Sequence, residues 1–230
     1  MCGRVVTTSS PKELSRHLGA AEIVDVLGGE DHNLAPTGQL PVVWAEARTG
    51  DGGRALTRVL GTARWGLVPK WADRPEIGAR MFNARAETVA EKPAFRQAFK
   101  QRRCVILADG FYEWHTEEGR KTPYFISFKV DHPFGMAGLW ENWHANDQPP
   151  LETCTIITTA ASRSISRLHE RMPVILDAPT TMDWIQPECE PDALLAMLKS
   201  CDDGEIQAWP VSRTVNNPAN QGSTLIERAG

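Results

Sequence analysis

The residue with the most distinctive chemistry is Cys2, because it directly follows the initiator Met1. Methionine aminopeptidase removes Met1 when the second residue is small, and cysteine qualifies. The mature chain would begin with a 1,2-aminothiol, whose amine condenses with an aldehyde and whose thiol then closes a five-membered thiazolidine. The amine (pKa about 8) and the thiol (pKa about 8.5) are both partly reactive at neutral pH. We expect cationic Arg4 to lower both pKa values further. The alternative is that Cys2 is an accident of the start codon.

A second candidate lies in residues 81–88, where Asn83, Arg85 and Glu87 occupy alternating positions. In an extended segment these three side chains would share one face. Asparagine can donate and accept hydrogen bonds around a carbonyl or ring oxygen, and arginine suits a phosphate. The alternative is a solvated strand face with no function.

Glu113 and Trp114 form a third candidate, in a strand-like segment that follows the apolar residues 105–107. Aromatic side chains flank Glu113, so we expect its carboxylate to be partly desolvated, with a raised pKa that suits proton transfer. Trp114 offers a flat face for a nucleic-acid base. The alternative is an edge strand with one outward-facing glutamate.

His169 is the best-placed acid–base candidate near neutral pH among the six histidines. It lies between a predicted helix and a predicted strand, and Arg167 and Arg171 add positive charge beside it. The alternative is a histidine that only interacts with the carboxyl end of a helix.

The five cysteines are irregularly spaced and include no CxxC pair, so we expect neither a metal site, a disulfide framework nor a cofactor bound by cysteine. Cys104 and Cys154 lie in apolar, β-branched segments and are predicted to be buried strand residues.

The elements that must position these residues are mostly strands. Short apolar and β-branched runs predict strands at residues 103–107, 123–128, 134–139, 153–159 and 173–176, and in parts of 56–68 and 206–211. Helical patterns cover residues 11–18 (with Ser10 as N-cap), 92–100, 162–168, 179–185 and 190–200. Hairpin loops are expected at residues 49–54 and 116–121. Strands do not alternate regularly with helices, which predicts an α+β domain built on a curved antiparallel sheet or open barrel.

Length and composition fit one folded domain. The chain has 230 residues, of which 41% are hydrophobic. The net charge of −4 argues mildly against nucleic-acid binding but does not exclude it, because local basic surface binds phosphate. No membrane-spanning stretch or secretory signal is recognised, which predicts a cytoplasmic protein without a membrane partner.

Several blocks, in this order, resemble one known family. They are Cys2-Gly3-Arg4, Asn33-Leu34-Ala35-Pro36, Arg64-Trp65-Gly66-Leu67-Val68-Pro69, Asn83-Ala84-Arg85-Ala86-Glu87-Thr88, Gly110-Phe111-Tyr112-Glu113-Trp114, His169-Glu170-Arg171-Met172-Pro173 and Pro210-Val211-Ser212. Together they span nearly the whole chain and resemble the SOS-response-associated peptidase (SRAP) family of abasic-site sensors. Two small departures are His32, where an aromatic residue is common, and Glu170, where aspartate is common.

The resemblance implies a single domain over residues 1–230 with a β-barrel-like core flanked by helices. It implies a monomer without cofactors that binds abasic sites in single-stranded DNA, nucleoid-associated when bound, and forms a thiazolidine crosslink. The implied roles are nucleophile for Cys2, positioning for Asn83, proton transfer for Glu113 and acid–base chemistry at the sugar for His169. The implied DNA contacts are Arg4, Asn33, Trp65, Arg85, Trp114 and Arg171.

Other functions would use an overlapping set of residues. A thiol peptidase, including self-removal of the residue before Cys2, would use the thiol as an N-terminal nucleophile, and an abasic-site lyase would use the amine. A non-covalent reader of single-stranded or modified DNA would not need Cys2. For any of the DNA functions, Arg102 and Arg103 are expected to help form a basic groove.

Overall fold

The computed structural model describes residues 2–19, 22–24, 29–50, 53–129, 133–145, 149–201 and 204–229. Their strands form two sheets. The smaller sheet has the order β14 (Ile206–Pro210), β9 (Arg120–Phe128), β8 (Gly110–Glu117), β1 (Val5–Thr7) and β3 (Asp31–Leu34). The larger has the order β12 (Arg171–Pro173), β11 (Leu151–Ala160), β10 (Phe134–Trp143), β7 (Arg103–Ala108), β4 (Gln39–Gly50), β5 (Gly53–Trp65) and β2 (Glu22–Ile23).

Two short strands join the larger sheet beside this path. β13 (Ile175–Leu176) pairs with β10, and β6 (Asn83–Arg85) pairs in parallel with β11. β5 also pairs with β11 over two residues, so the larger sheet curls back on itself through a short contact. The predicted α+β class is confirmed, with mixed sheets that are mainly antiparallel.

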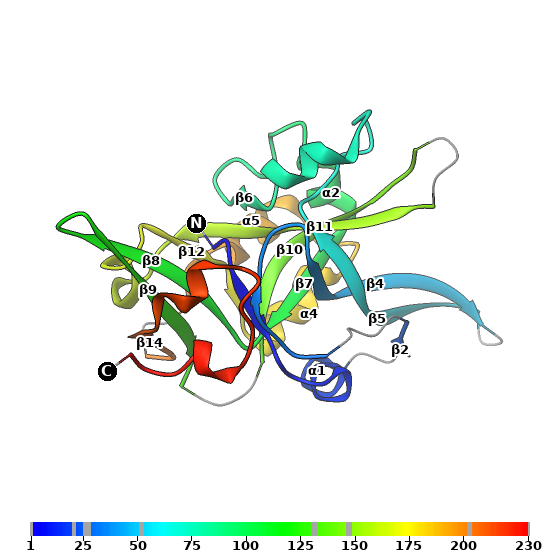
Figure 1. Cartoon of the computed structure of the whole chain (residues 1–230). Helices are drawn as coiled ribbons and strands as arrows, with labels where there is room; N and C mark the ends of the chain where they lie inside the picture. The colour runs from blue at the N-terminus through cyan, green and yellow to red at the C-terminus, as the bar shows by residue number, and fades with distance from the viewer. Residues whose placement is uncertain are drawn as a thin grey trace.

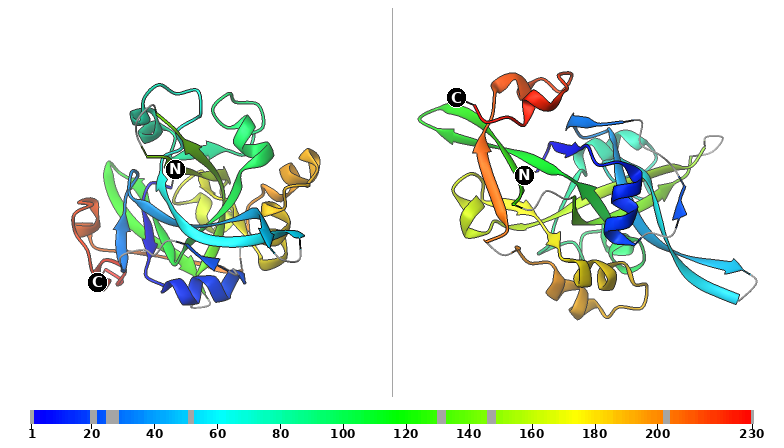
Figure 2. Two further views of the ribbon diagram at one scale, coloured as in Figure 1. Left: turned by 90° about the vertical axis from the view of Figure 1, so that its right-hand side faces the viewer. Right: turned by 90° about the horizontal axis from the view of Figure 1, so that it is seen from below.

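The helices are short and lie around the sheets, as Figures 1 and 2 show. The α-helices are α1 (Pro11–Leu18), α2 (Arg96–Gln101), α3 (Arg163–Ser166), α4 (Ala178–Ile185) and α5 (Pro191–Met197). Short 3-10 helices are η1 (Pro75–Arg80), η2 (Arg213–Asn216) and η3 (Ser223–Leu225). α1 has the predicted bounds because Ser10 and Glu13 form a reciprocal capping box at its start. In the part of the chain that the structure describes, no helix is long and apolar enough to cross a membrane.

Both predicted hairpins are present. β8 and β9 are joined at Glu118 and Gly119, which both have positive φ, as a two-residue turn of the I′ kind requires. β4 and β5 pair as far as Gly50 and Gly53, and residues 51–52 of the predicted loop lie outside the described residues.

The main core lies between the two sheets and includes Cys2, Trp65, Phe111 and Ile156. Side chains of β8 alternate between its two faces, so Phe111 and Glu113 face this core while Tyr112 packs on the other side with Phe125. A carboxylate is thereby carried into an apolar interior close to the amino terminus. Cys104 and Cys154 are fully buried, as predicted.

Candidate active site

Cys2 lies three residues before the start of β1 and is fully buried. Burial raises the pKa of its thiol, and the nearby charge of Glu113 raises it further. A hydrogen bond with the backbone of Arg4 lowers this pKa, as the expectation for Arg4 has it in direction, but burial outweighs it and the net shift is upward. The guanidinium of Arg4 instead donates hydrogen bonds to Asn33 Oδ1 and to the carbonyl of Val215, 2.5 Å and 2.9 Å away.

Asn83 holds the backbone of Cys2. Its Nδ2 donates a hydrogen bond of 2.6 Å to the Cys2 carbonyl oxygen, which joins residues 81 positions apart. β6 places Asn83 there by pairing with β11, which puts Asn83 opposite Ile156. The next residue, Ala84, is buried. Asn83 Oδ1 is buried and has no hydrogen-bond partner among the described residues, so the site retains one buried acceptor.

Glu113 is only 2% exposed. Burial raises the pKa of its carboxyl group, and an electrostatic interaction with His169 partly opposes the rise. The predicted rise of the Glu113 pKa is confirmed. It arises because Glu113 lies on the face of β8 that packs against the core. Because Glu113 acts electrostatically on both Cys2 and His169, these three groups are near neighbours.

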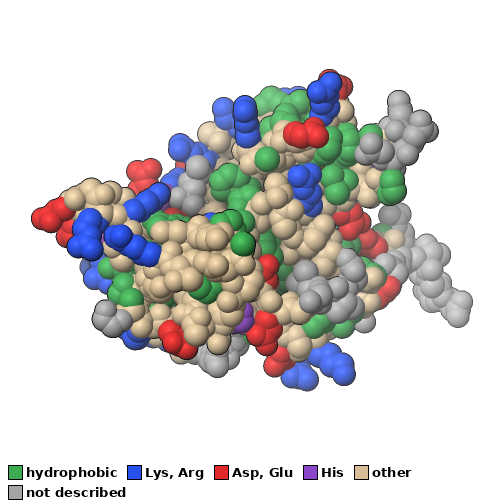
Figure 3. All heavy atoms as spheres, in the orientation of Figure 1, with side chains coloured by type: hydrophobic (Ala, Val, Ile, Leu, Met, Phe, Trp, Pro, Cys, Tyr) green, Lys and Arg blue, Asp and Glu red, His purple; other side chains and the backbone are tan. Residues whose placement is uncertain are grey.

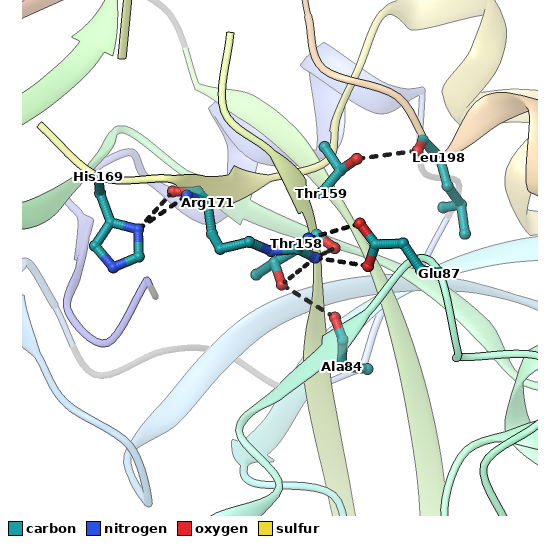
Figure 4. A network of polar contacts seen from close by, with 7 residues as sticks. All are labelled: Ala84, Glu87, Thr158, Thr159, His169, Arg171 and Leu198. Atoms are coloured by element: carbon teal, nitrogen blue, oxygen red, sulfur yellow. Dashed lines mark hydrogen bonds and ion pairs between the residues drawn. The ribbon is translucent and has the colours of Figure 1, made fainter. Parts of the chain in front are cut away.

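His169 is half-buried in the segment between α3 and β12. Its Nδ1 accepts a hydrogen bond of 2.9 Å from the backbone N–H of Arg171 (Figure 4). The structure thus brings Cys2, Asn83, Glu113 and His169 together from four separate parts of the chain. The expected chemical roles of these residues remain predictions.

Trp65 and Asn33 do not lie where a DNA contact is possible. Trp65 is fully buried, donates from Nε1 to the carbonyl of Phe82 at 2.8 Å and packs edge-on against that ring. Asn33 is 1% exposed and donates to carbonyls of the C-terminal segment at Val215, Asn217 and Asn220. The DNA contacts expected for these two residues are corrected accordingly, because covered side chains cannot touch DNA in this conformation. Trp65 instead supports the start of β6.

Other predicted DNA contacts are accessible to different degrees. Arg85 is exposed, and Trp114 is half-buried with its Nε1 donating to Asn216 Oδ1 at 2.7 Å. The guanidinium of Arg4 lies over the Trp114 ring, 5.6 Å from its centre. Arg171 makes an ion pair with Glu87 and is only 12% exposed. Phosphate contacts of Arg4, Arg85 and Arg171 remain predictions.

Arg102 and Arg103 do not form the basic groove that was expected of them. Arg103 is 4% exposed and donates to the carbonyls of Phe99, Lys100 and Trp184, so it closes the end of α2 and the end of α4. Arg102 forms an ion pair of 2.8 Å with Glu141. Adjacent arginines cannot be assigned to a surface from sequence alone, because a guanidinium can be buried where carbonyl oxygens surround it.

The sequence interpretation missed Trp71, which at 59% is the most exposed large hydrophobic side chain among the described residues. It directly follows Lys70, whose side chain is 61% exposed. The sequence signal that could have indicated this surface is a tryptophan beside a lysine just after residues 64–69. Figure 3 also shows Lys and Arg side chains gathered over the end of the β8–β9 hairpin, where Arg120 and Lys121 are exposed.

The mixed-sheet fold thus carries a site beside the amino terminus that combines the Cys2 thiol, the Asn83 amide, the Glu113 carboxylate and the His169 imidazole. A profile of the SOS response associated peptidase (SRAP) family matches residues 1–218, and the chain belongs to this family.

Similar proteins cover almost the full chain. The abasic site processing protein YoqW of Bacillus subtilis is 38% identical over 232 residues, with 99% of each chain covered. The abasic site processing protein HMCES of Xenopus tropicalis is 30% identical over 259 residues, covering 96% of this chain and 76% of its own. A crystal structure of a protein from Bacteroides thetaiotaomicron superposes with a TM-score of 0.86 at 25% identity, covering 99% of this chain and 100% of that one.

Proposed function

We propose that this protein processes abasic sites in single-stranded DNA by capturing them covalently through Cys2 after Met1 is removed. The observation that carries the proposal is the hydrogen bond from Asn83 to the Cys2 carbonyl, beside the buried carboxylate of Glu113. The names of the relatives YoqW and HMCES support abasic-site processing as the general activity. The covalent step is our inference from the site.

The reaction begins with the ring-opened sugar of an abasic site, which carries an aldehyde. The Cys2 amine attacks the aldehyde carbon, and loss of one water molecule gives an imine. The Cys2 sulfur then adds to the imine carbon while its proton passes to the nitrogen, which closes a thiazolidine. No oxidant or reductant is required.

Each neighbour of Cys2 has a distinct task in this scheme. Glu113 takes a proton from the Cys2 ammonium and returns it during dehydration, for which a raised pKa is suitable. His169 moves the hydroxyl proton when the closed sugar opens. Asn83 Oδ1, which has no hydrogen-bond partner in the part of the chain that the structure describes, is available to accept a hydrogen bond from the new amine. Removal of Met1 also places an ammonium beside the thiol, and that charge lowers the thiol pKa.

The aldehyde is the group that this proposal requires. A single strand with a natural abasic site is expected to give a heat-stable protein–DNA band on a denaturing gel. The same strand, reduced with borohydride so that an alcohol replaces the aldehyde, is expected to give none while still binding under native conditions. Equal crosslinking of both strands would contradict the proposal.

A peptidase would use the same thiol as its nucleophile and would not need the Cys2 amine, whereas capture of an aldehyde uses both groups of the aminothiol. Repeated turnover of an added peptide would favour the peptidase, whereas an adduct limited to one per protein favours capture. A lyase activity would follow from the imine, because an imine at the sugar promotes elimination of the 3′ phosphate.

Arg85 is expected to contribute to DNA affinity through phosphate, because it is exposed one residue beyond the buried Ala84. Arg85→Ala should weaken binding of different sequences by similar factors. It should also reduce the slope of log K against log salt by about 0.7, the value for one phosphate on a single strand. Arg16→Ala on α1 is the matched control. Sequence-dependent losses, or an unchanged salt slope, would contradict this role.

A further inference from the structure

Glu87 and Arg171 form a forked ion pair close to the proposed active site (Figure 4). Arg171 Nη1 and Nη2 donate to the two carboxylate oxygens of Glu87 at 2.6 Å and 3.0 Å. The pair joins the turn after β6 to the first residue of β12. Two parallel hydrogen bonds fix the orientation of a guanidinium more strictly than a single charge contact does.

The guanidinium also bonds to the strand between these two elements. Arg171 Nη2 donates to the carbonyl oxygen of Thr158 in β11 at 2.5 Å, and the backbone N–H of Ala86 donates to the same oxygen at 2.9 Å. The Thr158 hydroxyl in turn donates to the carbonyl of Ala84 at 3.3 Å. β6, β11 and β12 are thereby tied together by one polar network.

This network reaches both ends of the proposed site. β6 begins with Asn83, which bonds to Cys2. At β12, the backbone N–H of Arg171 donates to His169 Nδ1. Figure 4 shows the Arg171 side chain extending away from the imidazole toward Glu87, so the ion pair anchors the backbone whose N–H meets the ring.

The hydrogen bond to Nδ1 determines where the ring proton lies. A nitrogen that accepts from an N–H group cannot carry a proton itself, so the neutral imidazole is protonated at Nε2. The carbonyl oxygen of Arg171 lies 3.1 Å from the same Nδ1, which gives a protonated ring a ready acceptor. Small shifts of the Arg171 backbone would therefore change the tautomer of His169.

We propose that Glu87 and Arg171 are positioning residues that fix the place and tautomer of His169 relative to Asn83. The inference rests on the proposed function, in which His169 moves a proton at the sugar. The side chain of Arg171 is 12% exposed and that of Glu87 is 53% exposed, so the carboxylate covers a guanidinium that is otherwise enclosed by protein.

A competing role for Glu87 leads to opposite results. A carboxylate and a phosphate present similar oxygen pairs to an arginine fork, so Glu87 could instead occupy the place of a DNA phosphate on Arg171. In that case, removing the charge of Glu87 would tighten DNA binding and leave capture at saturating DNA unchanged or faster. A positioning role predicts slower capture at saturating DNA without weaker binding.

The test compares Glu87→Gln with wild type and with Glu91→Gln, an exposed glutamate in the same turn region. We expect Glu87→Gln to slow adduct formation at saturating abasic DNA at least about tenfold, a fraction of what positioned proton transfer contributes. Affinity for undamaged single-stranded DNA should not fall, and Glu91→Gln should match wild type. Glu87→Asp, which keeps the charge on a shorter side chain, should recover part of the rate.

The ring itself gives a second readout that needs no reaction. Nitrogen-15 NMR of the histidine side chains should show the Nε2–H tautomer for His169 in wild type and a mixture of tautomers in Glu87→Gln. An unchanged tautomer, or an unchanged rate at saturating DNA, would overturn the positioning role. If wild type forms no adduct, the proposed function fails, but the NMR comparison still decides whether the ion pair sets the ring.

Discussion

Replacement of Cys2 by alanine is expected to abolish the heat-stable adduct with abasic DNA completely. Cys2→Ala keeps the amine and the backbone carbonyl that Asn83 holds, but it removes the sulfur that closes the ring. Only a reversible imine can then form, and heating in water hydrolyses it. Cys2→Ser should behave similarly, because an oxygen closes the five-membered ring less favourably than sulfur does.

The control is non-covalent binding. Because the Cys2 side chain is buried, both variants should bind undamaged single-stranded DNA as wild type does. An uncleaved extension before Cys2 should block the adduct while leaving the thiol in place, since the extension ties up the amine. A heat-stable adduct with Cys2→Ala would show that another residue is the nucleophile.

Replacement of Glu113 by glutamine is expected to change reactivity and stability in opposite directions. Glutamine keeps the shape of the side chain but cannot take a proton from the Cys2 ammonium. General base catalysis typically contributes about 10²–10⁴-fold, so adduct formation at saturating DNA should slow by about 10²-fold or more. DNA affinity should change little, because Glu113 is only 2% exposed.

The stability change follows from the pKa of Glu113. Burial raises this pKa in the folded chain above its value in the unfolded chain. The unfolded chain therefore releases its proton first, and the folded state loses stability as pH rises from the unfolded pKa through the folded pKa. Above the folded pKa the folded chain carries the whole cost of a buried carboxylate. Glu113→Gln removes this cost and should raise Tm, by about 2–4 °C for each kcal/mol in a chain of this size.

The pH dependence separates this explanation from a general packing effect. The gain in Tm should shrink as pH falls and should vanish below the unfolded pKa, where Glu113 is protonated in both states. A constant gain at all pH values would assign it to packing. A loss of stability at neutral pH would show that the carboxylate stabilises the fold.

Local signals in the sequence were sufficient for most elements. Ser10 and Glu13 define the start of α1, and short β-branched runs locate β7, β10 and β11. Boundaries were less accurate where tertiary contacts set them. The helix predicted at residues 92–100 begins only at Arg96, after a series of turns from residue 86.

The strands β1, β2, β3 and β4 were not predicted as strands. β1 and β3 are too short to show a period, and they are defined by pairing with each other and with β8.

The sequence also identified the four residues of the proposed site but not their contacts. Asn83 meets Cys2 only because β6 pairs with β11 far along the chain, and no local pattern encodes that pairing. Burial was the main source of error. Trp65, Asn33 and Arg103 each have a polar group that suits DNA, yet each satisfies it with carbonyl oxygens inside the protein.

The role of Glu87 was not visible from the sequence for the same reason. It was predicted to share a face with Asn83 and Arg85, but β6 ends at Arg85 and Glu87 lies in the following turn. Its partner Arg171 is 84 residues away in the chain.

Intact mass spectrometry of the protein after incubation with an abasic single strand tests the central claim most directly. Thiazolidine capture predicts one new species, whose mass equals the protein without Met1 plus the DNA strand minus one water molecule. Digestion of this species should place the DNA on the peptide that begins with Cys2. An adduct that retains Met1, an adduct on another peptide, or no adduct with protein that has lost Met1 would contradict the claim.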